Sequence, residues 1–186
     1  IMRCWALMPP PPPIVLNIWR IWAYWRRRLL TSSTVVPLPR AMLDAYLDDL
    51  RSWVSELCRA AGNGPAVSLI DALHGPCSAP GAFSRWDAIG PHAAIRREYG
   101  LSRDALAILL VAAAPRLWGS LAHVYAAVTG RVVIDEHVLA TLLRDRSAVV
   151  RELARTGPLV AFGLVTIRPT GAVVASAEAV GRLAGR

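Results

Sequence analysis

The spacing of the apolar residues changes near Gly157, and this change constrains the fold more than any other feature of the sequence. From Met42 to Arg155, apolar residues recur every three or four positions, a period typical of amphipathic helices. Beyond it, residues 159–167 (LVAFGLVTI) form a continuous β-prone run, residues 168–171 favour a turn, and residues 172–176 are β-prone again. The pattern predicts a mainly α fold with a small β-hairpin.

Capping and breaking residues divide the helical part into segments. An amphipathic helix begins at Met42 and is stopped by the Gly62–Pro65 segment, and Ser102 has the side chain of an N-cap for a helix that we expect to end at Ala114, before Pro115. Asp135 and either Asp145 or Ser147 are the expected caps of two later helices. Further helices are expected over residues 66–73, 92–99, 118–128 and 177–183, with a Pro- and Gly-rich loop at 74–91.

The first forty residues differ from the rest of the chain. They hold four of the seven Trp and six Arg with no acidic residue, so they account for +6 of the net charge of +8. Three interpretations stay open for this leader: an amphipathic helix at a membrane interface, a flexible segment, or translated sequence upstream of a start at Met42, which we favour. The expected division is 1–41 as leader, 42–100 as an N-terminal helical region and 101–186 as a second domain. Residues 42–176 are expected to fold without the leader.

Composition argues against catalysis. All 21 basic residues are Arg, as in a high-GC bacterial genome, so a P-loop lysine, a Schiff base and a Ser-Lys dyad are excluded. The three Cys are widely spaced and the four His lack metal-ligand spacing, which predicts no metal site, no cofactor and reduced thiols in the cytoplasm. The Asp48–Asp49 pair is expected on a solvated helix face. We expect no enzyme activity and no small-molecule substrate.

Helices followed by a hairpin are the order of elements in a winged helix, so residues 101–186 are predicted to form a winged-helix-like domain. Residues 99–117 (YGLSRDALAILLVAAAPRL), Tyr125, residues 134–143 and residues 157–167 also resemble the winged-helix domain at the N-terminus of a group of bacterial AAA family ATPases. The family usually has an acidic residue after Ala-Pro, where this chain has Arg116. The resemblance implies an ATP-binding AAA module downstream of Arg186.

A domain of this kind without an active site can act mainly through its surface, so we expect an accessory or regulatory role through protein–protein contacts. Its expected partners are the downstream AAA module and a protein not identified by the sequence. Candidate contact residues are Phe83 and Trp86 in the loop and Arg168 at the hairpin turn. The edge of the hairpin could also accept a strand from a partner. Phe83 and Trp86 could instead fill the space between the N-terminal helices and the winged helix.

Two other functions stay open. A winged helix could bind DNA, with Arg144, Arg146, Arg151 and Arg155 as the phosphate-contacting residues, although Asp145 and Glu152 lie between these arginines. The Trp- and Arg-rich leader could instead attach the protein to the surface of a membrane.

Overall fold

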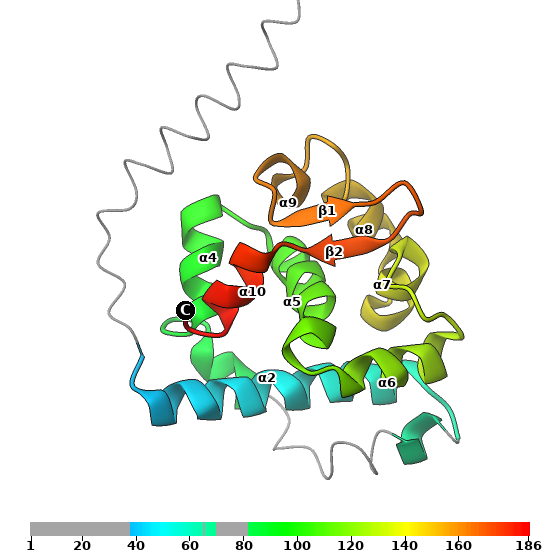
Figure 1. The fold of residues 1–186 in the computed structure, drawn as a ribbon, viewed down its shortest axis with the longest axis horizontal. Helices are drawn as coiled ribbons and strands as arrows, with labels where there is room; N and C mark the ends of the chain where they lie inside the picture. The colour runs from blue at the N-terminus through cyan, green and yellow to red at the C-terminus, as the bar shows by residue number, and fades with distance from the viewer. Residues whose placement is uncertain (1–37, 65, 70–81) are drawn as a thin grey trace, which may run out of the picture. The chain divides into compact units, whose positions relative to one another are not determined.

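The computed structural model describes residues 38–64, 66–69 and 82–186, and these residues form a mainly helical fold with a small antiparallel sheet, as the sequence predicted (Figure 1). Residues 1–37 of the expected leader, Pro65, residues 70–73 of the expected helix at 66–73 and residues 74–81 of the expected loop lie outside the described residues. The elements are α2 (Arg40–Ala61), the 3-10 helix η1 (Ala82–Trp86), α4 (Pro91–Tyr99), α5 (Arg103–Leu117), α6 (Ser120–Thr129), α7 (Glu136–Leu143), α8 (Arg146–Glu152), α9 (Pro158–Ala161), β1 (Val165–Ile167), β2 (Val173–Ala175) and α10 (Ala177–Leu183).

Helix α5 is the centre of the core. Nearly every residue from Ala105 to Ala114 is buried, as expected for a helix that is apolar on all sides. It contacts α2, α6, α7, α8, α9, α10 and β2. Residues of α2 and α4 belong to the same buried cluster as residues of α5 and α10, so the described parts of the two regions expected at 42–100 and 101–186 share one core.

Three predicted caps are present. The side chains of Ser102, Asp135 and Asp145 each accept a hydrogen bond from the backbone N–H three residues on, at the start of α5, α7 and α8. Ser102 Oγ also donates to Glu152 Oε1 at 3.0 Å, which links the start of α5 to the end of α8.

The hairpin forms at the predicted place but its first strand is shorter than expected. β1 pairs with β2 in antiparallel register, Thr166 opposite Val174, and the turn at 168–171 closes with a bond from Gly171 N–H to the Arg168 carbonyl. The expectation of one strand over 159–167 is wrong, because residues 158–161 form the helical turn α9. Pro158 has the backbone angle that starts a helix, and Gly163, at φ 66°, redirects the chain before β1 begins.

The expected end of α5 at Ala114 is also wrong, because the helix continues through Pro115 to Leu117. A proline inside a helix has no N–H for the carbonyl four residues earlier, here that of Val111. The buried Tyr125 hydroxyl of α6 donates to that carbonyl at 3.1 Å. A side chain from the next helix therefore supplies the hydrogen bond that Pro115 cannot make.

The outer edge of β2 is covered. On the side away from β1, Val173 N–H donates to the Ile134 carbonyl at 2.7 Å and the Arg116 guanidinium donates to the Ala175 carbonyl at 2.7 Å. Arg116 thus has a structural contact with the hairpin.

Candidate functional site

A cluster of aromatic rings joins α2, η1 and α4. Tyr46 and Trp53 come from α2, Phe83 and Trp86 from η1, and His92 from the first turn of α4; we call these five residues the aromatic cluster. Tyr46 meets Trp86 edge to face with the ring centroids 5.7 Å apart, and Phe83 stacks on both Trp53 and His92. The rings fix the short η1 segment on the long helix α2, since aromatic pairs add to the stabilisation from burial alone.

A buried carboxylate reinforces this attachment. Asp49 is 6% exposed, and its Oδ2 atom accepts a hydrogen bond of 2.7 Å from the Trp86 indole and lies 2.7 Å from the Arg85 guanidinium. The expectation that Asp48 and Asp49 form a solvated face is therefore wrong for Asp49, although Asp48 is exposed. Asp49 stands three residues after Tyr46 on the apolar side of α2, and this spacing was the signal that could have identified it.

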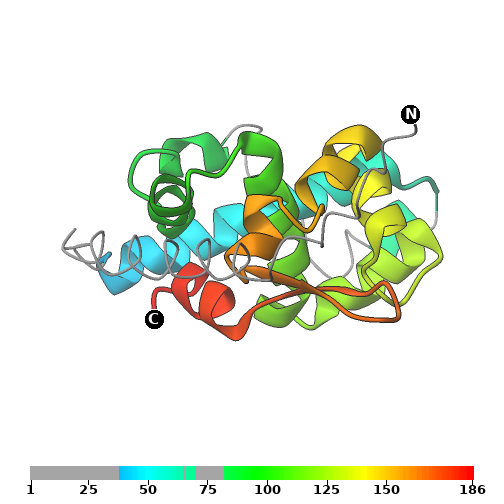
Figure 2. The same ribbon diagram turned by 90° about the horizontal axis from the view of Figure 1, so that it is seen from above.

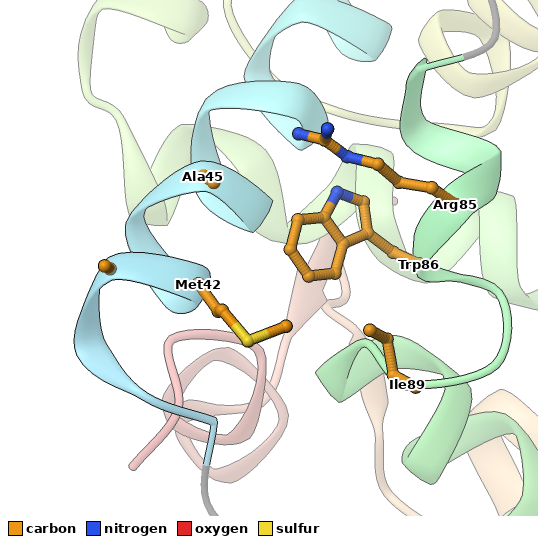
Figure 3. A pocket seen from close by; sticks show the side chains of 6 residues that line it. Met42, Ala45, Arg85, Trp86 and Ile89 are labelled. Carbon is orange, nitrogen blue, oxygen red and sulfur yellow. The ribbon is translucent and has the colours of Figure 1, made fainter.

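A shallow apolar groove opens beside the cluster, between the first turns of α2 and the segment that follows η1. Its volume is about 370 Å³. Figure 3 shows the Trp86 indole between the Arg85 guanidinium and the side chains of Met42 and Ile89, with Ala45 on the α2 side. Met42 is 38% exposed and Ile89 is 53% exposed. The groove, lined by Ala41, Met42, Ala45, Arg85, Trp86 and Ile89, thus has apolar walls that are open to solvent.

The end of the chain lies beside this groove. Figures 1 and 2 both place α10 and the C-terminal residues next to the first turns of α2. Gly185 packs so closely on Leu43 that a Cβ atom at Gly185 would lie 2.5 Å from the Leu43 side chain. A segment joined to Arg186 would begin next to the groove.

The residues predicted to contact a partner have different environments. Trp86 is 4% exposed and packs on Tyr46 of α2, whereas Phe83 is half-buried and packs on both α2 and α4, within the N-terminal helical region. Trp86 can meet a partner through the wall that it contributes to the groove. Arg168 is exposed at the hairpin turn, as its position in the sequence suggested.

Most of the arginines considered for DNA contact have partners within the chain. Arg144 donates to the Ala60 carbonyl, Arg146 lies 3.5 Å from Glu136, and Arg151 lies 2.8 Å from Asp104 and 3.4 Å from Glu152. Arg155 is exposed. Phosphate groups would have to compete with these intramolecular contacts. The sequence did not reveal the contacts, because the acidic partners Asp104 and Glu136 lie on other helices than the arginines.

The described residues give no support to a metal site, a reactive thiol or a membrane-spanning helix. They contain no group of three His, Cys, Asp or Glu side chains that could hold a metal ion. Cys58 is buried, and this burial raises the pKa of its thiol to about 12, so the thiol stays protonated and unreactive at neutral pH. None of the described helices has both the length and the apolar content needed to span a bilayer.

Comparisons of the chain with protein-family models, with curated proteins and with solved structures gave no match.

Proposed function

We propose that this chain is a non-catalytic accessory or regulatory module of an AAA family ATPase and that it binds the motor module through the groove beside Trp86. The family assignment rests on the sequence resemblance, which covers roughly residues 95–176. The observation that carries the choice of surface is the position of the chain end, with Gly185 packed against Leu43 next to an apolar groove.

The exposure of the groove supports a contact with a protein. Met42 and Ile89 are large apolar side chains on a surface that also presents the cation of Arg85, and the mostly buried Trp86 indole lies in the wall between them. Aromatic and arginine side chains are enriched at protein interfaces, where they combine apolar area with a polar group. A domain tethered at Arg186 would also have a high effective concentration at this surface.

The reading frame beyond Arg186 gives the first test. A GxxxxGK[ST] segment within the following few hundred bases would support the assignment, because this loop binds the nucleotide phosphates of such motors. A stop codon directly after Arg186 would remove the main support for it.

A binding titration tests the surface. The chain is titrated with the separately purified downstream module, and Ile89→Asp is compared with Val150→Asp, which changes an equally exposed apolar residue on α8. Because Ile89 is 53% exposed, its further burial contributes about 0.8–1.6 kcal/mol, so Ile89→Asp should weaken the Kd about four- to fifteenfold. Val150→Asp should leave the Kd unchanged. Equal effects of the two substitutions would reject the groove as the contact surface.

A further inference from the structure

His92 is enclosed in the aromatic cluster. Its side chain is 1% exposed and packs against two rings that also contact each other: Tyr46, at 5.6 Å and nearly parallel to it, and Phe83, at 4.7 Å. Neither ring nitrogen has a hydrogen-bond partner among the described residues. The backbone also closes on the ring, because a Cβ atom at Gly90 would lie 2.9 Å from His92 Nδ1. The enclosed site suits a neutral imidazole, and the charged acceptor near it, Asp87 Oδ1, lies 3.5 Å from Nε2, at the limit of a hydrogen bond.

The charged groups around His92 stabilise a protonated imidazole ring only weakly. From α2, Asp49 accepts a hydrogen bond from Trp86 and is already paired with the cation of Arg85. From the segment after η1, Asp87 Oδ1 lies 3.5 Å from His92 Nε2 but is 63% exposed, so solvent weakens its attraction.

The remaining charges oppose a cation or are paired. On α4 itself, Arg96 and the positive end of the helix dipole disfavour a charge on His92. From α10, Arg182 is paired with Glu98. Burial lowers the pKa of His92 below its ordinary 6.5; Asp87 partly offsets this effect and Arg96 adds to it.

We propose that His92 is an acid-sensitive latch for residues 83–92: the neutral ring holds η1 on α2, and protonation releases η1 together with Phe83 and Trp86. Release would remove the Trp86 wall of the groove and expose two aromatic side chains. The proposal concerns the fold of this chain and does not depend on which partner binds the groove.

The direction of the pH effect follows from the two states of the ring. In the open state the ring is solvated and takes up a proton near pH 6.5, whereas in the closed state it does so only at a lower pH. The closed state is therefore fully favoured above pH 6.5. Below that value, the ratio of open to closed molecules rises about tenfold per pH unit until the lower pKa is reached.

Hydrogen exchange of the whole chain tests the latch. Exchange is measured at about pH 7.5 and about pH 5.5, corrected for intrinsic rates, for peptides that cover 83–95 and for peptides of α5. Protection of the amides of Asp87, Gly90 and Ala93, which bond to carbonyls within this segment, should fall several-fold at the lower pH. Protection of α5 should not change. An equal loss in α5 would show global unfolding and overturn the latch, as would constant protection at 83–95.

Substitutions assign the effect to His92. His92→Phe keeps an aromatic ring for stacking but cannot take a proton, so protection at 83–95 should become independent of pH. His137→Gln removes an exposed histidine on α7 and should keep the wild-type response. If His92→Phe does not fold, the NMR titration of His92 in the wild-type chain decides the matter. A midpoint below 6.5 that moves lower still in Asp87→Asn supports the latch, and a midpoint at or above 6.5 refutes it.

Discussion

Because Tyr125 donates to the Val111 carbonyl that Pro115 leaves without a donor, the effects of substituting Tyr125 and Pro115 on the free energy of unfolding should depend on each other. Tyr125→Phe removes the hydroxyl that donates to the Val111 carbonyl and leaves that buried acceptor without the donor that Pro115 also fails to provide. An unsatisfied buried polar group costs about 1–3 kcal/mol of folding free energy. A loss of about 2 kcal/mol in a domain of this size would lower the Tm by roughly 4–8 °C.

A double-mutant cycle gives the decisive comparison. Pro115→Ala restores a backbone N–H to the Val111 carbonyl, so Tyr125→Phe should cost less than about 0.5 kcal/mol in that background, because no acceptor is then left unpaired. The free energy of unfolding is measured by urea denaturation followed by far-UV circular dichroism for the wild type, both single variants and the double variant. The expected coupling energy is at least about 1 kcal/mol. An equal cost of Tyr125→Phe in both backgrounds would refute the proposed compensation.

Three further results are expected. Ser102→Ala removes both the N-cap of α5 and the bond to the buried Glu152, and it should lower the free energy of unfolding by about 1–2 kcal/mol in urea denaturation. Deletion of residues 1–37 should leave the cooperative thermal transition nearly unchanged, because the described residues form a core of their own; a broad transition would contradict this. If the chain binds DNA instead, its retention on duplex DNA should weaken with salt and with neutralisation of Arg151 and Arg155, whereas weak retention unaffected by either change would exclude that function.

The acid-sensitive latch and the Tyr125 contact have a common origin in packing. Each depends on a polar group that the fold has removed from water, His92 in one case and the Val111 carbonyl in the other. The outcome differs because the Val111 carbonyl receives a donor from Tyr125, whereas the nitrogens of His92 find no hydrogen-bond partner in the described part of the chain. A satisfied buried group stabilises the fold, whereas a buried imidazole such as His92 lowers the stability of the closed state when it takes up a proton.

The sequence by itself determined the class of the fold and most helix boundaries. Apolar spacing predicted the helices and the hairpin, and side chains that bond to nearby backbone, such as Ser102, Asp135 and Asp145, marked the helix starts. These signals are local, because a cap or a helical period involves residues within a few positions of one another. The Pro158 error was also local, since a Gly-Pro pair can end one helix and start the next.

Only the tertiary structure decided which distant residues meet. The continuation of α5 through Pro115 depends on a hydroxyl from α6, and the burial of Asp49 depends on an indole 37 positions away. The groove likewise requires α2, η1 and the segment after η1 to lie together. Apolar spacing shows that a helix face is buried but not which element covers it, because the hydrophobic effect is non-directional and partner choice is decided by packing.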